Sequence, residues 1–279
     1  MTTELSLEVT LAVLGAALMH ATWNAMVKSA GDKLLDTALV CIGGAAVVVP
    51  FMFVVAVPAP AAWPWLAGSM LAHVAYFFCL VGAYKSGDLS HGYPIMRGTA
   101  PLLVASFAFL WLGESISASV WVGILLICGG VLSLGLTGKP TRAGLAWALG
   151  NGAIIAVYTM VDAAGVRASG DAASYVTWMF VLDCVPFGLI VLLWRGRALV
   201  DYLRANIVRG IIGGVCSSGA YGIAIWAMAR APVASVAALR ETAVVFGALI
   251  GAWFLKEGHL RARLSGAVVV AAGIAAIKA

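Results

Sequence analysis

Two arginines lie inside apolar stretches of this sequence, at equivalent places 143 residues apart. Arg97 falls about seven residues into its stretch, which is about 10 Å along a helix at 1.5 Å per residue, and Arg240 matches it. A planar guanidinium binds a carboxylate or phosphonate through two parallel hydrogen bonds, so the pair predicts an anion site where the two stretches meet. Alternatively, each arginine extends toward water or pairs internally, as Arg240 does if it is neutralised by the adjacent Glu241.

Polar side chains recur at helical spacing in two further apolar stretches. His20, Trp23 and Asn24 share one helix face, because offsets of three and four residues fall on the same side. Tyr158 and Asp162 share a face in the same way. A polar face in a membrane helix must meet protein or water, so these faces are candidate cavity walls. Hydrogen bonding between helices explains them equally simply, and Trp23 and Tyr158 also fit aromatic residues at a membrane surface.

A second group of candidate substrate-binding residues is aromatic or carries an imidazole. Such side chains supply apolar walls with a polar group, and their ring faces attract a cationic amine. A histidine of this kind can also serve only to pack the core. The group consists of His73, Tyr76, Tyr93, Tyr221 and Trp226.

Embedded carboxylates are candidates for proton coupling. Asp183 lies in the middle of an apolar stretch, where loss of water favours the neutral acid and allows a proton to be bound and released. Asp162 and Glu241 are the other embedded acids, and a structural ion pair is the alternative for each. Glu114 and Glu257 end their stretches, and we interpret both as helix caps or anchors.

No enzymatic, nucleotide-binding or metal-binding motif is present. The sequence lacks HExxH, a nucleophile elbow and GxxxxGK[ST], so no catalytic residues and no ATP hydrolysis are expected. The five cysteines have no metal-ligand spacing and are interpreted as apolar packing residues, so neither a metal nor another cofactor is predicted. The net charge of +5 is not clustered, which argues against nucleic acid as a partner.

The composition is that of a multi-pass integral membrane protein. Hydrophobic residues make up 63% of the chain, charged residues 10%, and the mean hydropathy is +1.02. Because backbone groups in lipid must pair within their own segment, the apolar stretches are predicted to be helices. Ten stretches fit: 8–27, 35–57, 63–84, 91–111, 117–136, 143–163, 173–194, 207–229, 233–254 and 261–277.

The sequence pattern indicates an internal duplication, in which the second half of the chain repeats the first. At an offset of 143 residues the matches are Arg97 with Arg240, Thr99 with Thr242, Leu112 with Leu255, Glu114 with Glu257, Gly123 with Gly266 and Gly130 with Gly273. A repeat of five helices must invert, because five crossings leave the second copy starting from the opposite face. We therefore predict an all-α membrane protein of ten transmembrane helices in two inverted five-helix repeats, a first half (1–138) and a second half (139–279). The repeated glycines predict that the fifth and tenth helices pack together, or against a second copy in a homodimer.

Positive charge is distributed unequally between the two ends of the predicted bundle. Of the 17 Lys and Arg residues, twelve lie in odd-numbered connections and three on the other side, which by the positive-inside rule puts both termini outside.

The segments LGESISASVWVGILLICGGVLSLG and LKEGHLRARLSGAVVVAAGIAAI resemble the two repeats of EamA-type transporters of the drug/metabolite transporter superfamily. The resemblance extends over essentially the whole chain. It implies a ten-helix basket that moves small metabolites such as amino acids without ATP, with both termini in the cytoplasm rather than outside.

These observations predict a secondary transporter in the lipid bilayer of a bacterial inner membrane. It is expected to move a small polar metabolite, an amino acid or organic anion, by alternating access. A lipid-carrier flippase or a non-transporting membrane subunit is the alternative.

Overall fold

The computed structural model describes residues 6–86, 89–135, 141–253 and 260–278, and throughout these ranges its regular secondary structure is helical. The α-helices are α1 (Leu7–Ser29), α2 (Lys33–Val48), α3 (Trp63–Ser86), α4 (Leu89–Trp111), α5 (Ala118–Gly135), α6 (Arg142–Ser169), α7 (Ala172–Arg195), α8 (Arg197–Ala205), α9 (Ile207–Met228), α10 (Val233–Arg240), α11 (Thr242–Trp253) and α12 (Leu260–Lys278). Short 3₁₀ turns, η1 (Val49–Phe53) and η2 (Pro60–Ala62), connect α2 to α3. The all-helical prediction is confirmed.

Seven helices of the described residues are long and apolar enough to cross a membrane, and they coincide with the first four and the sixth to eighth predicted stretches. The stretches predicted at 117–136 and 261–277 form α5 and α12, whose apolar parts Ala118–Ser133 and Val268–Ile277 are shorter. The single helix predicted at 233–254 is wrong. The chain turns at Glu241 and divides this stretch into α10 and α11.

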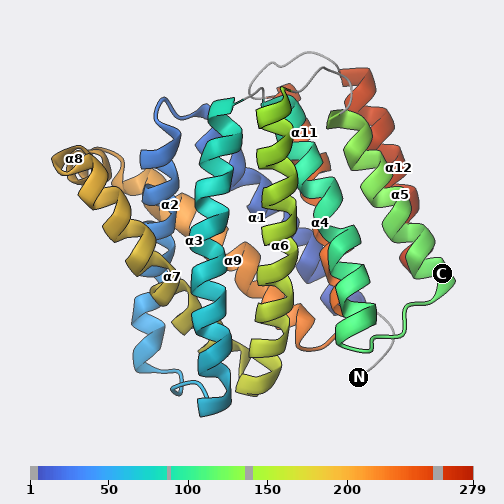
Figure 1. Ribbon diagram of the computed structural model, residues 1–279, viewed down its shortest axis with the longest axis horizontal. Coiled ribbons are helices and arrows are strands. Elements are labelled where there is room, and N and C mark those ends of the chain that lie inside the picture. The colour runs from blue at the N-terminus through green and yellow to red at the C-terminus, as the bar shows by residue number, and fades with distance from the viewer. Residues whose placement is uncertain (1–5, 87–88, 136–140, 254–259, 279) are drawn as a thin grey trace.

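The connection between α7 and α9 forms a helix that the hydropathy pattern did not predict. In α8, Leu199 is buried while Arg197 and Arg204 are exposed, so the helix is amphipathic rather than apolar throughout. It lies at the edge of the bundle beside α2 and α7 (Figure 1).

Several helices begin where the sequence supplies a capping side chain. Ser6, Asp32, Thr141 and Asp171 accept hydrogen bonds from backbone amides in the first turns of α1, α2, α6 and α7. Gly170 ends α6 in the left-handed region, with φ of 71°, which favours glycine. These local signals explain why α6 and α7 are separated by so short a turn.

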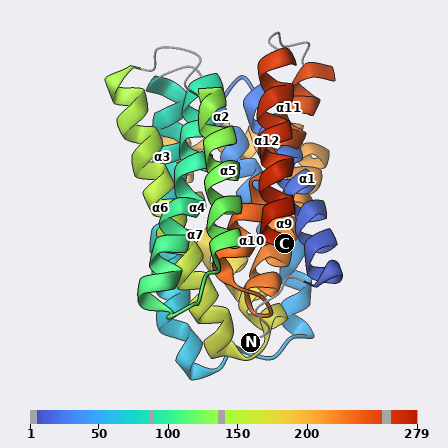
Figure 2. The same ribbon diagram turned by 90° about the vertical axis from the view of Figure 1, so that its right-hand side faces the viewer.

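Helices from both halves of the chain interleave in the bundle. α1 and α2 of the first half pack against α9 of the second, and α3 and α4 of the first half pack against α6 of the second. Figure 2 shows α5 and α12 side by side, and Figure 1 shows them at the side of the bundle away from α8. The main apolar core therefore lies between the halves rather than within each of them.

Glycines allow α5 and α12 to approach closely. A Cβ added at Gly123 would lie 2.6 Å from the carbonyl oxygen of Gly273, and one at Gly130 would lie 3.2 Å from that of Gly266. The prediction that the fifth and tenth helices pack together is confirmed within one chain.

Polar networks join helices at each end of the bundle. At one end, the buried Asp36 of α2 accepts hydrogen bonds from Arg209 Nε at 2.9 Å and from the Tyr202 hydroxyl at 3.0 Å. At the other, Glu114 accepts from the first amide of α10, that of Val233, and forms an ion pair with Arg167 of α6 at 2.9 Å. The interpretation of Glu114 as a cap agrees with this geometry; Glu257 lies outside the described residues.

Candidate functional site

A pocket opens between the two halves of the chain and is lined by seven helices. The first half contributes residues from α1, α2 and α3, and the second half contributes residues from α6, α7, α9 and α10. About 670 Å³ of space lies within the pocket and its opening. The lining residues are His20, Trp23, Thr37, Val40, Cys41, His73, Tyr76, Phe77, Tyr158, Phe180, Asp183, Ser217, Tyr221 and Arg240.

Most of the predicted site residues meet at this pocket. Those in its lining are His20, Trp23, His73, Tyr76, Tyr158, Asp183, Tyr221 and Arg240. Those outside its lining are Asn24, Tyr93, Arg97, Asp162, Trp226 and Glu241. The structure therefore brings together both polar helix faces and the aromatic group, but it separates the two arginines.

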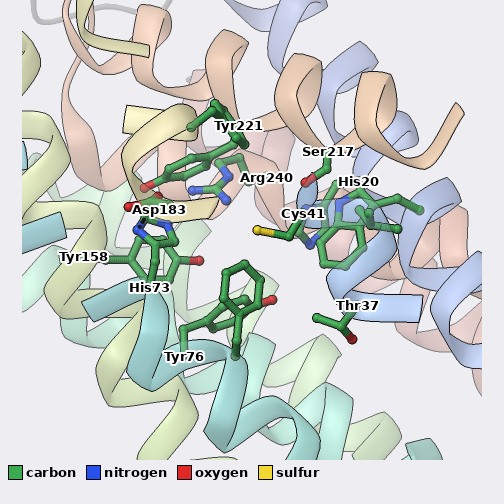
Figure 3. A pocket seen from close by; sticks show the side chains of 14 residues that line it. His20, Thr37, Cys41, His73, Tyr76, Tyr158, Asp183, Ser217, Tyr221 and Arg240 are labelled. Atoms are coloured by element: carbon green, nitrogen blue, oxygen red, sulfur yellow. Dashed lines mark ion pairs between the residues drawn. The ribbon is translucent and has the colours of Figure 1, made fainter. Parts of the chain in front are cut away.

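Arg240 is the arginine that faces the pocket. Its side chain comes from the last residue of α10, and its guanidinium carbon lies 4.9 Å from the ring centroid of Tyr221. Figure 3 shows the guanidinium beside Tyr221, next to the group formed by Asp183, His73 and Tyr158. Among the described residues no carboxylate forms an ion pair with it. Arg240 is therefore placed to bind an oxyanion.

Arg97 pairs with Glu241 instead of facing the pocket. Arg97 Nε donates to Glu241 Oε2 at 2.9 Å, and Arg97 Nη2 lies 2.9 Å from Oε1, so the contact has two points. Both side chains are buried, at 4% and 3% exposure. The predicted shared anion site of two arginines is thus not formed in this structure, and the predicted neutralisation of Glu241 by its neighbour Arg240 is replaced by an ion pair with α4.

Asp183 and His73 form the acidic and basic pair of the pocket. His73 Nδ1 lies 3.2 Å from Asp183 Oδ2, 3.0 Å from the Ser69 carbonyl oxygen and 3.1 Å from Ser69 Oγ. The Ser69 carbonyl oxygen can only accept a hydrogen bond, and so can Asp183 Oδ2 when Asp183 is ionised. Nδ1 is therefore the ring nitrogen that carries the proton. The other Asp183 oxygen, Oδ1, is buried and has no hydrogen-bond partner among the described residues, although Asp183 lines the pocket. Oδ1 can therefore bind a proton or accept a hydrogen bond from an ammonium group.

Asp162 lies behind the pocket wall and holds two tyrosines. It accepts from Tyr221 at 2.6 Å and from Tyr175 at 2.9 Å, and it is fully buried. Its carboxylate oxygens therefore already have strong partners. Of the three acids predicted for proton coupling, Asp183 is the one that reaches the pocket.

Aromatic rings form a continuous wall on one side of the pocket. His73 stacks on Tyr158 with ring centroids 4.4 Å apart, and Tyr158 meets Tyr221 edge to face at 5.5 Å. Tyr76 lies 5.6 Å from Tyr158, also edge to face. These rings give the pocket apolar faces between its positive and negative groups.

The remaining predicted residues make local contacts. The Asn24 side chain donates to the His20 carbonyl oxygen at 2.8 Å, and Trp226 is covered by Arg230 with 4.5 Å from guanidinium carbon to ring centroid. Tyr93 packs against the central apolar core. His20 and Trp23 meet edge to face at 5.2 Å, on the part of α1 that lines the pocket.

Six lining residues were not predicted from the sequence, namely Thr37, Val40, Cys41, Phe77, Phe180 and Ser217. Offsets of three and four residues put Thr37, Val40 and Cys41 on one face of α2. The same offsets put Phe77, Phe180 and Ser217 on the faces of the predicted residues His73, Asp183 and Tyr221. Apolar residues at such spacing are found equally on lipid-facing and core-facing surfaces of a membrane helix.

Comparisons with known proteins agree with this architecture. A sequence model of the EamA-like transporter family matches the chain over residues 8–136 and 142–278. A solved structure described as "Crystal structure of protein" matches with a TM-score of 0.77 at 20% sequence identity, covering 96% of this chain and 97% of that chain. At this identity the structural likeness establishes a shared fold.

Proposed function

Because this chain belongs to the EamA-like transporter family, we propose that it is a secondary transporter of a small polar metabolite, an amino acid or organic anion. The observation that carries the proposal is the pocket between the halves, whose wall includes both Arg240 and the partly unpaired Asp183. Charged side chains inside a membrane protein are costly, and they are usually found where a substrate or ion is handled. A purely structural bundle has no need of unmatched charges around a cavity.

We further propose ten transmembrane segments in two inverted halves, 1–138 and 139–279. The two short helices α10 and α11, of 8 and 12 residues, together make one segment, and α5 and α12 supply the last segment of each half. Helix packing supports this, because α1 packs on α9 as α6 packs on α3, and α4 packs on α6 as α11 packs on α1. In each of these two comparisons, exchanging the two halves of the chain turns one helix contact into the other.

The glycines of α5 and α12 support the same symmetry. Gly123 matches Gly266 in the sequence repeat, and Gly130 matches Gly273. In the structure Gly123 meets Gly273 while Gly130 meets Gly266. A twofold axis exchanges these two contacts, as it does in any interface where residue i meets j and j meets i.

Transport then follows from rocking of one half against the other around the pocket. Inverted repeats place the substrate site at their interface, and exchanging the conformations of the two halves exposes the site to opposite sides of the membrane. No ATP is consumed. The energy comes from the gradient of the substrate or of a proton exchanged for it.

The two charged groups define what the pocket accepts. Arg240 binds the carboxylate or another oxyanion of the substrate, and the aromatic wall contacts its apolar part. Asp183 either holds the substrate's ammonium group or exchanges a proton with water. His73 keeps Asp183 in place through its Nδ1 contact.

Uptake by purified protein in proteoliposomes tests the proposal. The panel consists of radiolabelled amino acids, dicarboxylates and phosphonates, each measured with and without a pH step across the membrane. Saturable uptake of at least one compound by the protein, absent from protein-free liposomes, is the expected result. Movement of a labelled lipid between leaflets without uptake of any of these solutes would instead support a flippase.

A further inference from the structure

The sequence repeat is broken at the residue beside each arginine. Arg97 matches Arg240 and Thr99 matches Thr242, but Glu241 matches Gly98. The two halves therefore carry two equivalent cations and a single acid between them. This difference decides which arginine is neutralised.

Packing explains why Gly98 has no acidic side chain. A Cβ added at Gly98 would lie 2.6 Å from Leu132 Cγ and 3.2 Å from the carbonyl oxygen of Cys128, both on α5. Any larger side chain requires Leu132 to move or α4 and α5 to separate. Glu241 neutralises Arg97, and an acid at position 98 would be its counterpart for Arg240. The packing of α4 on α5 leaves no space for such a side chain.

The turn between α10 and α11 directs Glu241 away from its neighbour. Successive residues of a helix point about 100° apart, since there are 3.6 residues per turn. At the end of α10, Arg240 faces the pocket and Glu241 faces α4, where Arg97 binds it at two points. Arg97 thus forms an ion pair with Glu241, the acid that lies nearest to Arg240 in the sequence.

We propose that Arg240 alone binds the anionic group of the substrate and that Arg97 is a positioning residue, which holds Glu241 so that it does not compete for Arg240. The inference rests on the proposed transport function and assigns the anion-binding group of that same pocket. It differs from a shared site, in which both guanidiniums contact the substrate.

The two arrangements predict different results when the ion pair is removed as a unit. If Arg97 acts only through Glu241, then neutralising both side chains removes the competitor together with its partner, and Arg240 still binds the anion. If Arg97 contacts the anion, the double substitution loses binding regardless of Glu241. In the neutral pair Arg97→Gln with Glu241→Gln, both side chains still form hydrogen bonds, and Gln has the length of Glu although it is shorter than Arg, so this variant removes the charges with little other change.

The experiment measures half-saturating concentrations for uptake into proteoliposomes of L-phenylalanine, succinate and methylphosphonate, with phenylalanine amide as a probe that lacks the carboxylate. Arg240→Gln is expected to raise the value for the preferred anionic probe by at least about tenfold, the effect of losing about 1.4 kcal/mol. Arg97→Gln should also raise the half-saturating concentration, because Glu241, no longer held toward α4, can then turn toward Arg240. Arg97→Gln/Glu241→Gln should return it to within about threefold of wild type. Arg230→Gln, an exposed arginine that stacks on Trp226, is the matched control and should leave the value unchanged.

Two results overturn the inference while leaving the transport function intact. One is an Arg240→Gln variant that takes up the anionic probe with wild-type affinity. The other is a folded double variant, judged by its size-exclusion profile, that loses binding as fully as Arg240→Gln. Wild-type protein that takes up none of the probes contradicts the proposed function itself, and this inference with it.

Discussion

Asp183 of α7 and His73 of α3 face each other across the two halves of the chain, with 3.2 Å between Oδ2 and Nδ1. Within the part of the chain that the structure describes, this contact leaves Asp183 Oδ1 without a hydrogen-bond partner. An ionisable group that belongs to both halves, and is only partly satisfied, is well placed to couple protonation to their relative movement.

Asp183→Asn is expected to abolish accumulation driven by a pH step, because an amide has no proton to exchange. Exchange of labelled for unlabelled substrate in the absence of a pH gradient should persist, since Asn still accepts and donates hydrogen bonds. Asp162→Asn serves as the comparison and should retain the response to pH, because Asp162 lies outside the pocket lining. Full pH-driven accumulation by Asp183→Asn would assign coupling to another group.

The two tyrosines that donate to Asp162 are expected to have different effects on transport. Tyr175→Phe and Tyr221→Phe each remove one hydrogen bond to a buried carboxylate, which costs about 1–3 kcal/mol of stability. Both variants should therefore melt at lower temperature in detergent. Only Tyr221→Phe should also raise the half-saturating substrate concentration, because the hydroxyl that it removes anchors to Asp162 the ring that contacts Arg240 in the pocket. Equal effects of both variants on that concentration would show that Asp162 acts on the site by another route.

The close approach of α5 and α12 is tested by one methyl group. At Gly123 an added Cβ would meet Ile277 Cγ1 at 2.5 Å and the Gly273 carbonyl oxygen at 2.6 Å, so Gly123→Ala must push the helices apart. We expect a loss of about 1–3 kcal/mol, seen as a lower melting temperature. Gly129→Ala is the matched control on the same helix, because no atom of a described residue outside its own turn lies within 4 Å of its Cβ position. Unchanged stability of Gly123→Ala would mean that the two helices are further apart than the structure has them.

Acid stability is expected to depend on Asp32, which caps α2 and pairs with Arg195. Partial burial acts to raise the pKa of Asp32, but the Leu35 amide and the Arg195 guanidinium outweigh it, so the pKa lies below its ordinary value of 3.8. A depressed pKa stabilises the folded state above the unfolded pKa, and that stabilisation is lost as the pH falls through the folded-state pKa. Asp32→Asn keeps a capping side chain, so at pH 6 it should cost less than about 1 kcal/mol for this exposed pair.

This difference between wild type and Asp32→Asn should disappear as the pH is lowered below 3.8, as measured by melting temperature across a pH series. In an Arg195→Gln background it should already be smaller at pH 6. A difference that stays constant down to the lowest pH would show that the capping geometry, and not the charge, is responsible.

The sequence by itself determined the helical membrane class and seven of the spans, because hydrophobicity over about 20 residues is a property of neighbouring residues. The repeated glycines predicted close helix packing for α5 and α12, either together or against a second copy, and the structure shows that they pack together. The break at Glu241 could not be predicted in this way, because the stretch from Val233 to Trp253 is apolar on both sides of it.

The tertiary structure alone decided which charges are satisfied. From its position, Glu241 appeared to neutralise Arg240, yet it pairs with Arg97, 144 residues away in sequence. In the sequence, Asp162 and Asp183 are both acids within apolar stretches. In the structure, two tyrosine hydroxyls donate to Asp162, whereas Asp183 lines the pocket. The physical reason is that a charged side chain in a membrane protein is stabilised by the groups that face it across a helix interface. Spacing along the chain indicates which face of its helix a residue occupies, but it does not indicate which residues lie opposite that face.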